Sequence, residues 1–159
     1  MTERETDTLV ETLAAIPRRL EALAQQASET TAGVAGDEAW TPSEIVGHLC
    51  DSARYWGARM FRVAHEVNPR LASFDENILV DLAAYRYRAL DELLRGFRLL
   101  AEGNVSLLRS LDAAAWDRAG THETRGSLTL REIVAIEAGH EQVHVGQLAE
   151  ALGIGKSGG

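Results

Sequence analysis

TLREIVAIEAGHEQVHVGQLAEAL, residues 129–152, decides the fold, because it predicts one long helix that carries two histidines on the same face. Thr129 and Glu132 form the capping-box pattern that begins a helix. His140 and His144 are four residues apart, so their imidazoles lie one above the other on such a helix. This spacing is suited to two ligands of one metal ion.

The string His140-Glu141-Gln142-Val143-His144 also matches the zinc-peptidase pattern H-E-x-x-H, in which the glutamate is the general base. The rest of the chain argues against a peptidase. In the extended form of this motif, a Gly follows the second histidine by three residues and a third histidine ligand follows it by six. This chain has Gln147 and Glu150 at those positions, and only fifteen residues follow His144. A third ligand must therefore come from upstream.

Apolar residues recur with helical spacing along nearly the whole chain, whereas convincing runs of alternating, β-branched residues are absent. We therefore expect an all-α protein, one domain over residues 1–159 with its core at about 5–153. Its long helices would bury their apolar stripes as a four-helix bundle, and bundles build metal sites from inward residues on facing helices. The expected helices are Glu5–Gln26 with Pro17 as a kink or restart, Pro42–Glu66, Glu76–Leu111 with a break near Arg88, and Thr129 to about Leu152; Asp117–Ser127 is expected to be a loop.

Composition excludes several classes of partner. The hydrophobic fraction of 45% is enough for a core, but no run approaches the roughly twenty apolar residues of a membrane helix. A net charge of -8 opposes binding to nucleic acid. The charged segment Met1–Asp7 lacks an apolar targeting core, so we expect a cytoplasmic location. The lone Cys50 cannot form an internal disulfide and is expected to be a small buried hydrophobic residue.

His48 is the candidate third ligand. It lies seven residues past the cap at Thr41, about 10 Å into its helix, while His144 lies about 12 Å before the end of the last helix. Antiparallel packing of the two helices would bring these histidines level. His48 also shares an apolar stripe with Ile45 and Leu49, where an unpartnered imidazole is costly to bury. Spacing alone is compatible with a metal ligand or with a hydrogen-bonded core histidine.

Carboxylates three or four residues from these histidines could orient an imidazole or act as a general base. Glu44, Asp51 and Glu137 have this spacing. Glu44 is already used by a capping box, so we favour Asp51 and Glu137, with capping or solvated carboxylates as the alternative. Glu141 lies about 100° around the helix from its histidine neighbour and is expected to be a solvated surface group.

Other polar and aromatic residues have simpler interpretations. His65 occupies the last turn of its helix, where the helix dipole favours a cation, and His122 falls in a polar loop. The tryptophans are expected to be core anchors, and the arginine run a solvated face. These residues are Trp40, Trp56 and Trp116, and Arg86, Arg88, Arg95 and Arg98.

The chain contains, in order, Trp40-x-x-x-Glu44-Ile45-Val46-x-His48-Leu49-x-Asp51-Ser52, Trp116-Asp117-x-x-Gly120-x-His122 and His140-x-x-x-His144-x-x-Gln147-Leu148. This combination resembles the DinB/YfiT-like family of metal-binding four-helix bundles over nearly the whole chain. The resemblance implies up-down-down-up topology with a long crossover connection, here at Val67–Asn77, and a metal triad of His48, His140 and His144. It also implies that two copies can pair as a homodimer. Relatives include thiol-dependent isomerases and thiol S-transferases as well as many members without an assigned reaction, so the resemblance is compatible with a low-molecular-weight thiol as a cofactor.

Three neutral imidazoles leave a divalent ion its full charge and, in a tetrahedral centre, one open position for water, thiol or substrate. Zinc is expected first, although nickel, iron and copper also accept such ligands. The first hypothesis is a metal-dependent enzyme acting on a small molecule, of thiol-transferase or hydrolase type. The alternative is a non-catalytic metal-binding or stress-related bundle protein. A ferritin-like dimetal centre, suggested by Glu137-x-x-His140, lacks the second Glu-x-x-His and two further glutamates that it needs.

Overall fold

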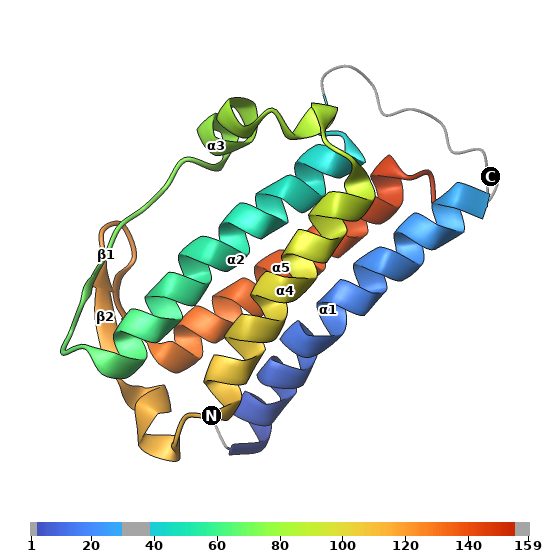
Figure 1. Cartoon of the computed structure of the whole chain (residues 1–159). Coiled ribbons are helices and arrows are strands. Elements are labelled where there is room, and N and C mark those ends of the chain that lie inside the picture. Colours follow the sequence, from blue (N-terminus) through green and yellow to red (C-terminus); the bar gives the residue numbers. More distant parts are fainter. Residues whose placement is uncertain (1–2, 30–38, 155–159) are drawn as a thin grey trace.

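The structure, a computed structural model, describes residues 3–29 and 39–154 and confirms the all-α four-helix bundle (Figure 1). Its long helices are α1 (Glu3–Glu29), α2 (Pro42–His65), α4 (Leu90–Arg109) and α5 (Leu130–Ala151). The predicted capping boxes begin α2 and α5, because the side chains of Thr41 and Thr129 each accept a hydrogen bond from the backbone N–H three residues on. Pro17 lies inside α1 without ending it.

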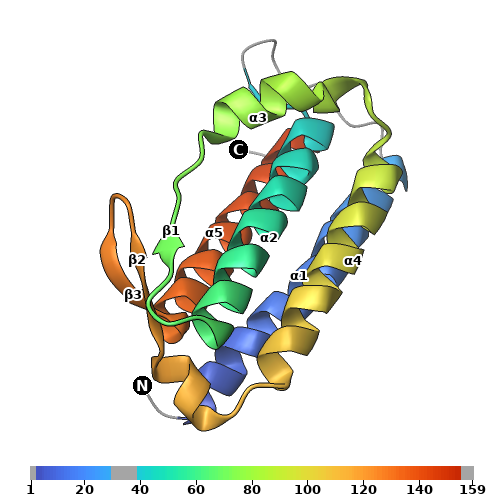
Figure 2. The same ribbon diagram turned by 60° about the vertical axis from the view of Figure 1, so that its left-hand side comes forward.

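The four helices run up, down, down and up (Figures 1 and 2). Helices α1 and α2 each pack against both α4 and α5. Because α2 runs antiparallel to α5, residues near the start of α2 lie level with residues near the end of α5, as the sequence predicted. None of the described helices combines the length and apolar character of a membrane span. The inward faces bury a core that includes Ile16, Leu20, Leu49, Phe97, Ile133 and Leu148.

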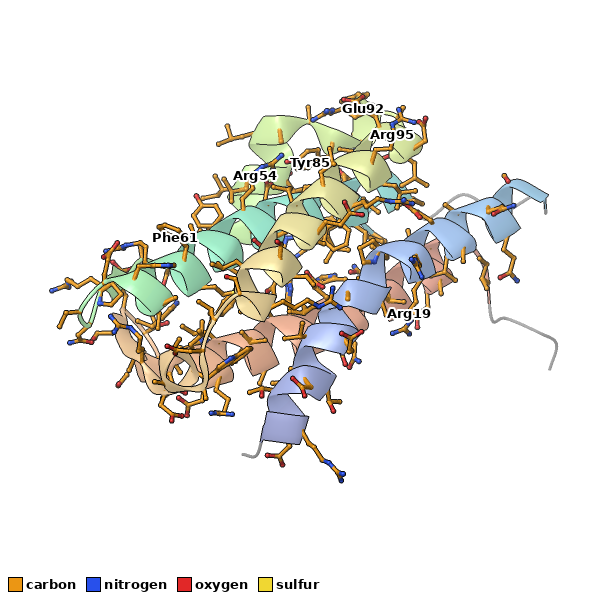
Figure 3. The ribbon with its side chains drawn as sticks, turned by 60° about the horizontal axis from the view of Figure 1, so that its bottom comes forward. Arg19, Arg54, Phe61, Tyr85, Glu92 and Arg95 are labelled. Atoms are coloured by element: carbon orange, nitrogen blue, oxygen red, sulfur yellow. The ribbon has the colours of Figure 1, made fainter. Side chains whose placement is uncertain are left out.

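The crossover connection is longer than expected. It joins the parallel helices α2 and α4 through β1 (Arg70–Leu71), α3 (Glu76–Ala83) and the short helix η1 (Tyr85–Tyr87). The helical stretch expected from Glu76 does break near Arg88: α3 ends at Ala83, the following Ala84 has a left-handed φ of 51°, and α4 begins at Leu90. Packing explains this break: the Tyr85 ring is buried against Gly47 of α2, and its hydroxyl donates to Asp51 at 2.8 Å. Figure 3 shows Tyr85 beside Arg54, which donates to the same carboxylate.

The prediction of a loop at Asp117–Ser127 is wrong, because this segment contains most of a β-hairpin. After the short helix η2 (Ala113–Asp117), β2 (Ala119–His122) pairs antiparallel with β3 (Gly126–Thr129) and parallel with β1 of the crossover. Strands of two to four residues are too short to show an alternating pattern. The sheet ties the crossover to the hairpin that leads into α5 (Figure 2).

The close packing of Tyr85 on Gly47 predicts that a larger residue at position 47 destabilises the protein. A Cβ at position 47 would lie 2.2 Å from the tyrosine ring, so Gly47→Ala should lower the free energy of unfolding by about 1–3 kcal/mol through overpacking. Gly103→Ala is the matched control, since nothing lies within 4 Å of that added Cβ and alanine raises helix stability by up to about 1 kcal/mol. Urea denaturation measures both. Equal stabilisation by the two substitutions would contradict the proposed anchoring of Tyr85.

Candidate metal centre

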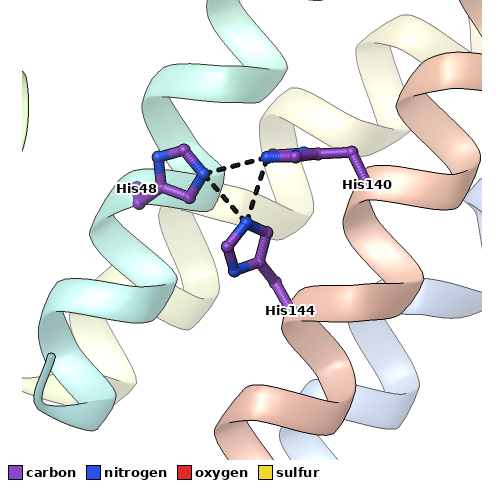
Figure 4. Close-up of side chains that lie close together, drawn as sticks. All are labelled: His48, His140 and His144. Atoms are coloured by element: carbon purple, nitrogen blue, oxygen red, sulfur yellow. Dashed lines mark hydrogen bonds between the residues drawn. The ribbon is translucent and has the colours of Figure 1, made fainter. Parts of the chain in front are cut away.

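Three histidines converge between α2 and α5. The Nε2 atom of His48 lies 3.0 Å from that of His140 and 3.1 Å from that of His144, and the latter two are 3.0 Å apart (Figure 4). The rings point toward one another from two helices that are distant in sequence. These are the three residues of the predicted triad, and their donor atoms form the kind of group that holds a metal ion.

The three nitrogens cannot satisfy one another. A neutral Nε2 either carries a proton or offers a lone pair, so at least two of the three are in the same state and repel. Protonation is disfavoured, because burial and the neighbouring histidines lower the pKa of His48 to about 3, and burial and His144 lower the pKa of His140 to about 4. Ligand nitrogens of a tetrahedral zinc site lie about 3.3 Å apart, given bonds of about 2.0–2.1 Å. The triad therefore fits a divalent ion closely.

Gln147 fixes the tautomer of His144. Its Oε1 atom lies 2.6 Å from Nδ1 of His144, and because an amide oxygen only accepts, Nδ1 carries the proton. The lone pair is thereby left on Nε2, where a metal would bind. Gln147 belongs to the family motif but was given no role from sequence, although its spacing of three residues from the candidate ligand His144 was the available signal.

Glu137 and Ser52 lie behind His140. Nδ1 of His140 is 3.3 Å from the Ser52 hydroxyl and 3.8 Å from Oε2 of Glu137, and that hydroxyl lies 3.4 Å from both Glu137 oxygens. The structure thus brings Glu137 to a candidate ligand histidine, whereas Ser52 was not singled out from sequence. His48 has no comparable partner among the described residues: its Nδ1 is buried and unpaired, and the ring packs against Trp40 at 5.1 Å.

The expectation that Glu141 is solvated is wrong. Its side chain is only 3% exposed, because α5 packs against α1 as well as α2 and so has more than one buried side. Burial raises the pKa of Glu141 to about 8. Burial and the charge of Glu141 raise the pKa of Glu137 well above its usual range. These two carboxyl groups therefore keep at least one proton between them near neutral pH.

Asp51 and Glu44 lie against other partners. The Asp51 carboxylate accepts hydrogen bonds from Tyr85 and Arg54, both at 2.8 Å, rather than from one of the three imidazoles. Glu44 caps α2 and forms an ion pair with Arg86 at 3.1 Å. Both carboxylates thus hold the end of the crossover against α2.

Glu76, the first residue of α3 in the crossover, lies beside the triad although no sequence pattern indicated it. Its Oε2 atom lies 3.7 Å from Nε2 of His48, and its side chain is half exposed. Glu76 and His140 both line a pocket of about 450 Å³ between α2, α5, the crossover and the hairpin. His122, expected in a loop, is in fact buried in β2 and lines this pocket. No sequence spacing relates the crossover to the triad, so this arrangement had no local signal.

The remaining candidates lie outside the triad. The ring of His65 packs on Phe61 and its Nδ1 lies near a backbone carbonyl. Cys50 is buried as predicted, its thiol donates to the Leu93 carbonyl at 3.4 Å, and burial raises its pKa to about 11. Trp56 and Trp116 are buried, and the arginine run is paired with carboxylates along the surface, as expected.

Gln147→Ala should weaken metal binding by about 10–100-fold, because His144 loses the acceptor that fixes its tautomer. Gln142→Ala, on the exposed side of the same helix, is the control and should bind as the unmodified protein does. Competition with a chromophoric zinc chelator measures both affinities. Equal affinities for the two variants would show that Gln147 does not orient the ligand.

Comparison with known proteins agrees with this architecture. A protein of Oceanobacillus iheyensis named "Putative metal-dependent hydrolase OB0782" is 27% identical over 109 residues, which are 69% of this chain and 63% of that protein's length. The chain thus spans less than two thirds of this curated relative. A solved structure with a similar fold is YfiT from Bacillus subtilis, described as a probable metal-dependent hydrolase with an unusual four-helix bundle topology. It superposes with a TM-score of 0.83 over 97% of this chain and 91% of its own, at 21% sequence identity. The two proteins therefore share the fold. The family model of the DinB superfamily matches residues 12–148, and the chain belongs to that superfamily.

Proposed function

We propose that this protein is a divalent-metal-dependent enzyme that acts on a small molecule, of hydrolase or thiol-transferase type. The observation that carries the proposal is the triangle of Nε2 atoms from His48, His140 and His144, beside Glu76 and a pocket of about 450 Å³. A divalent ion held there would lower the pKa of a bound water or thiol and so supply a nucleophile near neutral pH. Zinc is the first expectation for this ligand set, with nickel, iron and copper as alternatives. The name of the Oceanobacillus relative supports the hydrolase type.

The residues around the triad preorganise it. Gln147 holds Nδ1 of His144, while Ser52 and Glu137 lie against Nδ1 of His140. Each partner favours a proton on Nδ1 and a lone pair on Nε2. A site held in this way needs little rearrangement when its ligand binds.

Glu76 is the carboxylate best placed to accept a proton from the nucleophile. It is half exposed, lines the pocket and lies 3.7 Å from Nε2 of His48. Glu137, a candidate base from sequence, is buried behind His140 and its pKa is raised by burial, so we assign it to positioning that imidazole. Asp51, the other candidate, is held by Tyr85 and Arg54, and we assign it to fixing the crossover that carries Glu76.

Pocket size supports a small substrate. Pockets of roughly 300–1,000 Å³ are typical of sites for small molecules. The space beside His140 is within this range, and aromatic and aliphatic side chains of Trp56, Phe74 and Ile136 form part of its wall.

Glu76→Gln should keep stoichiometric metal but lower kcat by about 10²–10⁴-fold, because a positioned general base contributes that much to a proton transfer. Asp81→Asn is the matched control, since Asp81 is exposed on the same helix, away from the pocket beside His140. Elemental analysis gives the metal content, and turnover is followed on a panel of esters and on electrophiles offered with low-molecular-weight thiols.

One result would contradict the enzyme proposal, and another would contradict only the role of Glu76. Stoichiometric metal without turnover of any ester or electrophile by the unmodified protein would favour the non-catalytic metal-binding alternative. Equal turnover by Glu76→Gln and the unmodified protein would remove Glu76 as the base while leaving the metal-dependent reaction in place.

A further inference from the structure

The pocket beside the triad is lined by two arginines and a histidine from two separate elements. Arg59 of α2 lines it, as do His122 and Arg125 of the hairpin, together with His140 and Glu76. In a protein with a net charge of -8, this concentration of cationic and donor groups next to the candidate metal centre is a local exception. It points to a negatively charged group on the ligand.

Arg59 is the one buried arginine of the described residues, with only 6% of its surface exposed. Its guanidinium lies over the rings of Trp56 at 4.6 Å and Phe74 at 5.4 Å. Its one hydrogen bond to a described residue goes to the backbone carbonyl of Ala72, and no described carboxylate lies within ion-pair distance. A guanidinium has five N–H donors, so most of them have no acceptor among the described residues.

Several more exposed arginines do have a carboxylate partner. Exposed arginines on α2, η1, α4 and the segment after η1 form ion pairs with carboxylates, although water would solvate them in any case. Arg59 is buried, where an unpaired charge is most costly, and the carboxyl groups of Glu137 and Glu123 act on its charge only from beyond ion-pair distance. A ligand anion would remove this cost, and the flat guanidinium can bind a carboxylate or phosphate through two parallel hydrogen bonds.

His122 adds a hydrogen-bond donor to the lining of this pocket. Its Nδ1 accepts a hydrogen bond from the backbone N–H of Thr124 at 3.2 Å, so the neutral ring carries its proton on Nε2. No described residue accepts from that Nε2 atom. Burial and the charges of Arg59 and Arg125 lower the pKa of His122, which keeps the ring in this neutral form. Arg125 itself is exposed on the hairpin and has no ion pair among the described residues.

We propose that Arg59, His122 and Arg125 form a subsite that binds an oxyanion, a carboxylate or a phosphate, of the small-molecule ligand. The subsite shares its pocket with His140 and Glu76, so a ligand anchored by its anion would place a second, reactive group at the candidate metal centre. The part of this inference that concerns the reaction rests on the proposed function. Binding of the anion does not depend on the proposed function, because Arg59, His122 and Arg125 are not among the candidate metal ligands. The substrate class is therefore a small organic acid or phosphate ester whose reactive group is separated from its anionic group.

The test uses the metal-free full chain and three probes of similar size: benzoate, phenyl phosphate and the neutral benzamide. Titrations at fixed ionic strength are followed by nuclear magnetic resonance, with the indole N–H of Trp56 as the signal of the pocket. We expect at least one of the two anions to bind about tenfold more tightly than benzamide and to shift this signal. Tighter binding of benzoate assigns the subsite to carboxylates, and tighter binding of phenyl phosphate assigns it to phosphates.

Arg59→Gln and Arg125→Gln should each weaken binding of the preferred anion by about tenfold. Arg125→Gln lies on the exposed hairpin, so it keeps the test valid if the buried substitution unfolds the protein. Arg19→Gln, on the exposed surface of α1, is the control (Figure 3). Anions that bind no better than benzamide, or an Arg125→Gln variant that binds them unchanged, would overturn the subsite. Failure of metal binding or turnover with intact anion binding would overturn the proposed function alone.

Discussion

Three imidazole nitrogens within 3.1 Å of one another, drawn from two helices, are the constraint on which the rest of the structure depends. They repel unless a cation lies between them, so their convergence has to be enforced by the fold. A slip of α5 by one turn, about 5.4 Å, would separate His48 from the other two. The capping boxes at Thr41 and Thr129 define where both helices begin, and the packed core between the helices fixes their relative height.

The topology of the bundle brings further polar residues to the triad. Because α2 and α4 are parallel neighbours, the chain must return along the whole bundle, and this long crossover carries Glu76 to within 3.7 Å of His48. The β1–β2 pairing joins the crossover to the hairpin, which brings His122 and Arg125 to the same pocket. A simple up-down-up-down bundle, with short connections, would have no segment to cover this side of the metal centre. Thus the long crossover between α2 and α4 is also the segment that brings Glu76 to the candidate site.

The sequence predicted what local spacing and caps determine. Helix boundaries at α2 and α5, and the pairing of His140 with His144, followed from patterns within one helix, whereas family resemblance was needed to choose His48. Contacts between segments could not be predicted in this way. Glu141 was misplaced because a single apolar stripe does not reveal that α5 is covered by two neighbours. Glu76 was missed because the position of the crossover depends on the tertiary packing of Tyr85 against α2, which no local sequence pattern shows.

X-ray absorption spectroscopy of the zinc-loaded protein most directly tests whether residues from both α2 and α5 bind a single ion. Three imidazole ligands with zinc–nitrogen distances of about 2.0–2.1 Å are expected, and replacement of His48 by Ala should reduce the number of imidazole ligands from three to two. A spectrum with only two imidazole ligands in the unmodified protein, unchanged by His48→Ala, would show that α2 contributes no ligand and would contradict a shared metal centre.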